Sequence, residues 1–243
     1  MRIYKSAQGV GITVIGVTLL MLFYTYGRAL WVPAYKKVVG KETVFSVIEK
    51  YGENAEKRLK LYFDDADIPY PPKELKLLAI KDEKKLELWA SSGNGFEKIK
   101  NYQIRAASGT SGPKLVEGDK QVPEGIYKIT GLNPNSSYHL SMKLNYPNEF
   151  DLYHANNEGR SSPGTNIFIH GKEVSIGCLA VGDRAIEELF TLVHKVGIKN
   201  TEVIISPSDP RKAPLSPPTG NEQPWVPELY KSITTAFLKY REI

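Results

Sequence analysis

The chain is organised around the stretch IHGKEVSIGC, which runs from Ile169 to Cys178. Cys178 is the only cysteine in the 243 residues, and His170 precedes it by eight positions. A thiol becomes a useful nucleophile when a nearby base or positive charge activates it, and an imidazole can be that base. Gly177 lets the backbone turn tightly, so the amides of Gly177 and Cys178 can point at one oxygen atom, as in an oxyanion hole. The stretch therefore predicts acyl-transfer chemistry at a cysteine.

The bulk composition is that of a globular protein with a mild basic excess. The chain is 41% hydrophobic and 24% charged, and its formal net charge is +5. This length and composition predict one large domain, or one domain with an appendage. A basic excess favours anionic surroundings such as a cell wall or a membrane surface. Because the basic residues are scattered along the chain, we expect no nucleic acid partner. We also expect no cofactor.

Residues 1–30 are predicted to be a membrane anchor or a signal segment. The stretch from Ser6 to Gly27 carries no charge and is long enough to cross a bilayer as a helix. Arg2 and Lys5 precede it and favour a cytoplasmic N-terminus. A cleaved signal peptide is the alternative, although the nearest cleavage pattern, residues 32–34, contains an unsuitable proline. In either case the body of the protein is exported.

Export changes the meaning of a lone cysteine. Structural cysteines in oxidising compartments come in pairs, so an unpaired cysteine there is a free thiol and indicates a functional role. The alternative is a cysteine that serves only as a small buried hydrophobic residue. A redox role is disfavoured because there is no second cysteine to resolve a disulfide.

Residues 31–72 are expected to form a tether and a helical segment. Apolar residues with helical spacing run from Thr43 to Phe63, and Tyr51-Gly52 in the middle leaves open one helix or two short ones. The acidic run from Asp64 to Asp67 lacks the glycine and the closing glutamate of a calcium loop, so we interpret it as a solvated helix end.

Residues 73–207 show the pattern of a mainly β domain of the α+β class. Three alternating apolar runs between Glu74 and Ile104 predict a meander of antiparallel strands. The stretch from Ser108 to Pro123 predicts a long loop, and loops of that length usually serve a site or are mobile. A buried strand is expected from Asn166 to His170, and a helix is expected to begin near Asp183 as its N-cap.

Residues 208–243 are predicted to form a proline-rich segment and a C-terminal helix. The amphipathic pattern of the helix runs from Leu229 to Tyr240.

The central stretch resembles the catalytic signature of the L,D-transpeptidase (YkuD-like) domain, in which His170-Gly171 is followed by Ser175-x-Gly177-Cys178. The resemblance covers roughly Lys73 to Pro207 and is similar to the YafK-like murein branch of that family. The other segments that carry it are LELW at 86–89, GPKLVEGD at 112–119, PEGIY at 123–127, NPNSSYHLS at 133–141, NYPN at 145–148, GCLAVGD at 177–183 and IEE at 186–188.

The resemblance implies a β-sandwich with short helices and a ping-pong reaction on peptidoglycan. Cys178 would attack the diaminopimelate carbonyl of a tetrapeptide stem, expel the terminal D-alanine, and pass the acyl group to an amine or to water. By resemblance His170 is the base, the Gly171 carbonyl orients its imidazole, and the Gly177 and Cys178 amides hold the oxyanion. Contacts with the substrate are expected from Tyr138, His139 and Ser175. For His139 the alternative is a histidine satisfied by its neighbours, and His154 is expected in a solvated polar loop.

The same resemblance implies where the protein acts. We expect a bacterial inner-membrane protein with a single span and a periplasmic catalytic domain, or a periplasmic protein if the N-terminal segment is cleaved. Its partners would be peptidoglycan stem peptides, the inner membrane and a wall-linked lipoprotein that a hydrolytic member of the branch could release.

Two positions depart from the usual family pattern. Ile176 stands where many members have histidine, and Ala180 stands where many have arginine, which removes a carboxylate anchor. These departures leave open hydrolysis in place of transfer, and a non-catalytic wall-binding module. A zinc hydrolase would need ligands from His139, His154, His170 and Cys178, but their spacings match no zinc motif, so we expect no metal site. A thiol-reactive carbapenem should acylate Cys178 if the site is active.

Overall fold

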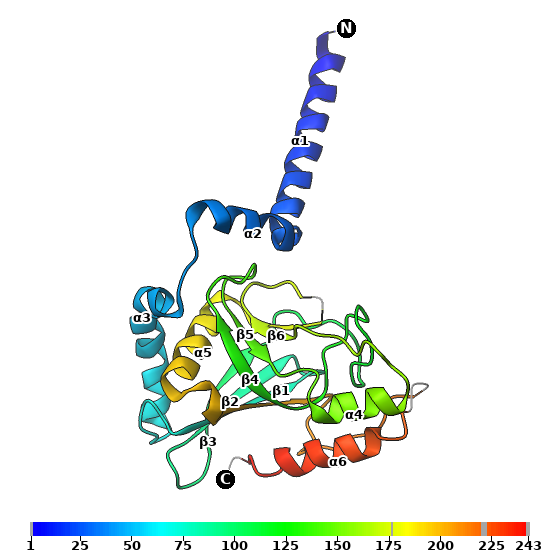
Figure 1. Ribbon diagram of the computed structural model, residues 1–243. Coiled ribbons are helices and arrows are strands. Elements are labelled where there is room, and N and C mark those ends of the chain that lie inside the picture. Colours follow the sequence, from blue (N-terminus) through cyan, green and yellow to red (C-terminus); the bar gives the residue numbers. More distant parts are fainter. Residues whose placement is uncertain (1, 176, 220–222, 242–243) are drawn as a thin grey trace. The chain divides into compact units, whose positions relative to one another are not determined.

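The computed structural model describes residues 2–175, 177–219 and 223–241, with side chains from Thr13 onward (Figure 1). It divides into two compact units, one that ends at Lys41 and one that begins at Glu42. Each unit is described by itself.

The N-terminal unit consists of two helices, α1 (Arg2–Tyr26) and α2 (Arg28–Val39). Among the described residues searched, no single helix combines the length and the apolar character that a membrane span needs. The helical stretches Thr13–Tyr26 and Arg28–Val39 meet that test only as a pair, and the pair is bent by 77°.

The second unit is a mixed α+β structure built on one eight-stranded sheet with the order β3-β2-β1-β8-β4-β5-β6-β7. Its strands are β1 (Glu74–Ile80), β2 (Lys85–Ser91), β3 (Glu97–Gln103), β4 (Gly125–Asn133), β5 (Ser141–Leu144), β6 (Phe168–His170), β7 (Leu179–Ala180) and β8 (Thr201–Ser206). Its helices are α3 (Val44–Asp65), α4 (Glu149–Asn157), α5 (Asp183–Val196), the short 3₁₀ helix η1 (Ile198–Asn200) and α6 (Val226–Phe237).

The predicted meander is confirmed, because β1 pairs antiparallel with β2 and β2 with β3. The expected sandwich of two sheets is not what forms. The first residues of β4 pair with β8, its last residues pair with β5, and the register shifts between Ile129 and Gly131. Strand β4 therefore joins strands β3, β2, β1 and β8 to strands β5, β6 and β7 in one continuous, curled sheet. The α+β class is as expected.

The sheet has an apolar core on each face. On β1, Leu75, Leu77 and Ala79 belong to the core that includes residues of α3 and α5, while Leu78 and Ile80 belong to a second core with residues of α6. Successive residues of a strand point to opposite faces, so the apolar run from Leu77 to Ile80 in β1 fills both cores. Helix α6 is thus part of the folded core of this unit.

Helix α3 is one continuous helix, so the alternative of two short helices is wrong. It begins with a capping box in which Thr43 and Ser46 each accept the backbone amide of the other. A Cβ atom at Gly52 would lie 3.2 Å from Ile48 Cγ2 and 3.8 Å from Thr191 Cγ2 of α5. A Cβ atom would therefore crowd Ile48 of the same helix, while its contact with α5 would be an ordinary one. The acidic run from Asp64 lies at the C-terminal end of α3, as predicted.

Helix α5 begins at Asp183, but Asp183 is not its N-cap. The N-cap is Gly182, and the Asp183 side chain turns to the neighbouring loop, where Oδ1 accepts the Lys172 amide at 2.8 Å. Because Asp183 is used in this way, the start of α5 is fixed against the segment that follows His170.

Truncation of α6 on its core face should destabilise the protein strongly. Phe237→Ala removes a side chain that is 0% exposed and is expected to cost about 3–5 kcal/mol of unfolding free energy, through lost apolar burial and the cavity left behind. Leu238→Ala, at the adjacent position with a side chain 38% exposed, is the matched control and should change that free energy by less than about 1 kcal/mol. Urea titrations compare the two variants, and equal costs would place the C-terminal helix outside the core.

Candidate active site

Two very short strands bring His170 and Cys178 together. Strands β6 and β7 run parallel, with Ile169 opposite Leu179 and His170 opposite Ala180. Cys178 is the residue before β7 and lies at a bend of the backbone. Its thiol meets the Asn166 carbonyl and the backbone of Phe168, on the segment that leads into His170.

The His170 ring is held by its own segment. It is only 3% exposed, and Nδ1 lies 2.6 Å from the Gly171 carbonyl oxygen. A carbonyl can only accept, so Nδ1 carries the proton and Nε2 bears the lone pair. Burial lowers the pKa of His170, and the bond to Gly171 partly opposes this. The Tyr138 ring packs against the imidazole with a centroid separation of 4.8 Å and an interplanar angle of 34°.

Gly171 is required by space. A Cβ atom at this position would lie 2.7 Å from the Tyr138 carbonyl oxygen and 2.8 Å from Asp183 Oδ1, both closer than real Cβ atoms come. The backbone at Gly171 packs closely against Tyr138 and the start of α5, and this packing fixes the carbonyl that contacts the imidazole.

The Cys178 thiol is partly exposed and stays protonated at neutral pH. Burial raises the pKa of Cys178, while a backbone hydrogen bond at Phe168 and the positive charge of Lys114 lower it by less. Within the described residues the thiol donates to the Asn166 carbonyl at 3.8 Å, and no hydrogen bond joins it to His170. Catalytic hydrogen bonds are often long in the absence of substrate. A neutral thiol beside a neutral imidazole fits general-base activation better than a preformed ion pair.

Both backbone amides expected to hold an oxyanion are occupied by serine hydroxyls. The Cys178 amide donates to Ser175 Oγ at 2.9 Å, and that hydroxyl donates to the Cys178 carbonyl at 2.6 Å. The Gly177 amide donates to Ser108 Oγ at 2.6 Å. Ser175, expected to contact substrate, is thus committed to Cys178, and Ser108 is a site residue that the sequence analysis did not single out.

The other histidines have neighbours of their own. His139 Nε2 lies 3.0 Å from Glu187 Oε1 on α5, and its ring meets the edge of Tyr51 on α3 at 5.2 Å. His139 therefore has protein partners, and its contact with substrate stays a prediction. His154 lies in α4 and stacks on Trp225 at 4.7 Å, so the expectation of a solvated loop is wrong. Across the described residues, no three His, Cys, Asp or Glu side chains are grouped to hold a metal ion.

Lys114 is a second site residue that the sequence analysis missed. Its side chain is buried, and Nζ donates to Asp119 Oδ1 at 2.5 Å and to the Val116 carbonyl at 2.9 Å. Its positive charge lowers the pKa of Cys178, against the larger opposite effect of burial. Lys114 stands in the GPKLVEGD segment, but nothing in a loop motif indicates that its lysine will be buried.

The two departures from the family pattern fall differently in the structure. Ile176 lies outside the described residues, and Ala180 is fully buried and pairs with His170 across β6 and β7.

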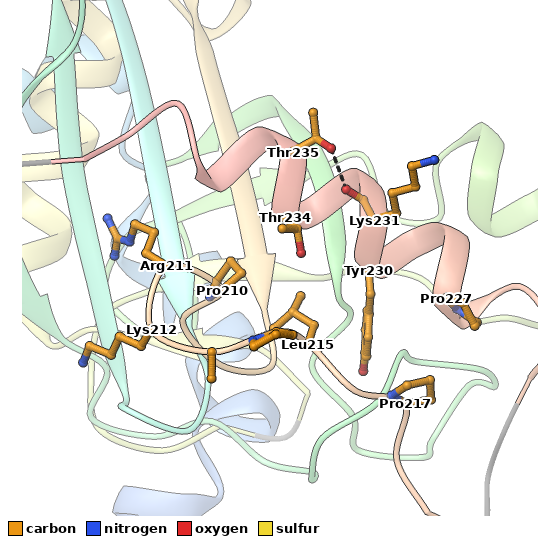
Figure 2. Close-up of a pocket in the computed structure, with 12 residues that line it drawn as sticks. Pro210, Arg211, Lys212, Leu215, Pro217, Pro227, Tyr230, Lys231, Thr234 and Thr235 are labelled. Carbon is orange, nitrogen blue, oxygen red and sulfur yellow. Dashed lines mark hydrogen bonds between the residues drawn. The ribbon is translucent and has the colours of Figure 1, made fainter.

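A groove elsewhere on the unit contains none of these residues. It has a volume of about 520 Å³ and lies between residues 210–217 and α6, with Tyr230 in its wall (Figure 2). The Tyr230 hydroxyl donates to Glu124 Oε2 at 2.8 Å, and Glu124 Oε1 accepts the Gly112 amide at 2.8 Å. The groove is therefore connected to the loop that carries Ser108, but the thiol lies apart from it.

Comparison with known proteins matches residues 75–205 to the family described as YkuD, L,D-transpeptidase catalytic domain. The chain is 35% identical over 115 residues to the YafK protein of Escherichia coli, whose name classes it provisionally as an L,D-transpeptidase. That alignment covers 46% of this chain and 44% of the relative, so the chain spans less than half the length of the curated relatives it matches.

Two solved structures are similar at lower levels. The helical cell shape determining protein Pgp2 from Campylobacter jejuni aligns at 21% identity with a TM-score of 0.46, covering 61% of this chain and 55% of that one. Bd1075 from Bdellovibrio bacteriovorus aligns at 22% identity with a TM-score of 0.41, covering 58% and 50%.

Proposed function

The chain belongs to the L,D-transpeptidase (YkuD) catalytic domain family, and on that premise we propose that it is a cysteine acyltransferase that acts on peptidoglycan tetrapeptide stems. The observation that supports the proposal is the pairing of β6 with β7, which brings the segment of Cys178 against the strand of His170, whose Nδ1 is bonded to the Gly171 carbonyl. The proposed roles are nucleophile for Cys178, base for His170 and orienting carbonyl for Gly171.

The proposed first half-reaction forms a thioester. His170 Nε2 takes the thiol proton while Cys178 Sγ attacks the diaminopimelate carbonyl that is bonded to the terminal D-alanine. The carbonyl oxygen becomes an oxyanion, for which backbone amides at Gly177 and Cys178 are the proposed donors. When the intermediate collapses, the carbon–nitrogen bond breaks, and the proton held by His170 passes to the D-alanine amine as it leaves.

In the proposed second half-reaction, His170 takes a proton from the incoming nucleophile. An amine of a second stem gives a cross-link, and water gives a tripeptide stem, and in both cases the thiol is regenerated. Hydrolysis is the second candidate, because a fully buried Ala180 offers no guanidinium to anchor a carboxylate of the peptide substrate. A wall-linked lipoprotein is a candidate substrate of such a hydrolase.

The test is a product assay with purified protein and diaminopimelate-containing disaccharide tetrapeptides. We expect release of free D-alanine, together with cross-linked dimers if the enzyme transfers or tripeptides if it hydrolyses, each resolved by mass spectrometry. Binding of the protein to sacculi without any release of D-alanine would contradict the proposal and favour a non-catalytic wall-binding module.

We also propose that the N-terminal segment holds the protein at the inner membrane with residues from Glu42 onward in the periplasm. The support is the uncharged stretch from Ser6 to Gly27 behind Arg2 and Lys5. Carbonate extraction of membranes should leave the intact chain in the pellet, whereas a shortened chain in the periplasmic fraction would mean that the segment is a cleaved signal.

A further inference from the structure

Ser108 is bonded to the Gly177 amide, one of the two donors proposed for the oxyanion. Its Oγ accepts the Gly177 amide at 2.6 Å and donates to the Lys120 carbonyl at 2.7 Å. A hydroxyl has one proton, and here that proton is directed at Lys120, so the oxygen presents lone pairs to Gly177. An oxyanion bound by the same amide would present lone pairs in the same way.

Only one of the two amides is controlled from a distance. The Cys178 amide is bonded to Ser175, three residues earlier in the same segment. The Gly177 amide is bonded to a residue 69 positions away in sequence, on the loop formed by residues 108–123. Whether the Gly177 amide is available therefore depends on this loop and not on the cysteine segment.

From this geometry we propose that Ser108 is a positioning residue that occupies the oxyanion position between turnovers, so that each acyl donor must displace its hydroxyl from Gly177. This inference rests on the proposed function, because it concerns the same thiol. The inference adds a resting state in which the Ser108 hydroxyl blocks the Gly177 amide. The rate of Cys178 acylation then depends on how easily this hydroxyl is displaced.

The loop itself is firmly anchored, so we expect the side chain of Ser108 to move and not the whole loop. Gln121 Nε2 donates to the carbonyls of Thr110 and Gly112 at 2.8 and 2.6 Å, and its Oε1 accepts the Thr110 amide at 2.8 Å. At the base of the loop, Lys81 donates to Glu124 at 2.8 Å and to the carbonyls of Gly112 and Val122.

Gly109 keeps the next residue of the loop close to Gln121. It has a φ of +92°, and a Cβ atom there would lie 1.6 Å from Gln121 Oε1. With the backbone held on both sides, rotation of Ser108 about χ1 is the simplest way to release Gly177. Side-chain rotation of this kind takes picoseconds to nanoseconds at exposed positions.

The test compares two reactions of the same thiol in the purified full chain. Acylation by a carbapenem passes through an oxyanion, whereas alkylation by iodoacetamide does not. Ser108→Ala should acylate Cys178 about fivefold faster than the wild type, the factor expected when one competing neutral hydrogen bond is lost. Its alkylation rate should be unchanged. Intact-protein mass spectrometry follows both reactions.

Two variants serve as controls. Ser108→Thr keeps the hydroxyl and should acylate at the wild-type rate. Ser111→Ala removes a hydroxyl from the same loop away from Gly177 and should also leave the rate unchanged. If Ser108→Ala folds poorly, as judged by its melting temperature, Ser108→Gly replaces it.

The outcomes separate this inference from the proposed function. If the wild type is not acylated at all, the proposed function fails. If the wild type is acylated but Ser108→Ala is no faster, or is faster in alkylation by the same factor, the proposed role of Ser108 is overturned while the thiol chemistry stands.

Discussion

Replacement of Cys178 by alanine should abolish D-alanine release from tetrapeptide stems while leaving the protein folded. Without the sulfur no thioester can form, and His170 alone has no nucleophile to activate. The expected loss is about 10⁴-fold or more, the scale seen when a covalent nucleophile is removed from an enzyme. Because the Cys178 side chain is only partly buried, the change in unfolding free energy should stay within about 1 kcal/mol.

Cys178→Ser is the matched variant, since it keeps a hydrogen-bond donor of similar size in the same place. This variant should also be inactive, because a serine hydroxyl is far less acidic than a thiol and is a weaker nucleophile. Retention of more than a few per cent of the activity in Cys178→Ala, with the melting temperature unchanged, would mean that the sulfur is not the nucleophile.

Replacement of His170 by glutamine should lower the acylation rate about 10²- to 10⁴-fold and change its pH dependence. In the wild type, burial lowers the pKa of His170 below its ordinary value of about 6.5. The base is then neutral and active above that lowered pKa, and the rate falls only as the pH drops through it. The wild-type profile should therefore show an acid limb centred below about pH 6.5.

The His170→Gln variant should lose this acid limb. Its rate should rise only in the alkaline range, as the thiol ionises unaided, and burial raises the pKa of Cys178 above its ordinary value of about 8.5. His139→Gln is the control, because His139 contacts Glu187 and Tyr51 and is expected to leave the limb in place. Carbapenem acylation rates from about pH 5 to 10 give the profiles, and survival of the acid limb in His170→Gln would exclude His170 as the base.

The sequence was informative where a pattern is long or repeated. The meander of β1 to β3 follows from about thirty residues of alternation, and the start of α5 near Asp183 was predicted as well. Gly52 was misleading in isolation, because the cost of one glycine, about 1 kcal/mol, does not break a helix whose Val47, Leu59 and Phe63 are buried in the core.

The sequence was least informative where a few residues make one long-range contact. Strands β6 and β7 have three and two residues, too few for any periodicity, yet their pairing places His170 beside the cysteine segment. The bond from Gly177 to Ser108 joins residues 69 positions apart, and the burial of Lys114 depends on Asp119 and on the fold of the loop. Local patterns do not encode such contacts, so spacing and resemblance could propose His170 and Cys178 but not the Ser108 hydroxyl that accepts the Gly177 amide.

The central claim is that Cys178 carries the acyl group, and a single-turnover acid quench with enzyme in excess over tetrapeptide stem tests it most directly. We predict a mass increase on the peptide that contains Cys178 equal to the stem without its terminal D-alanine, removed by hydroxylamine and absent after iodoacetamide treatment. Complete release of D-alanine from a protein whose Cys178 is alkylated, with no adduct at any quench time, would contradict it.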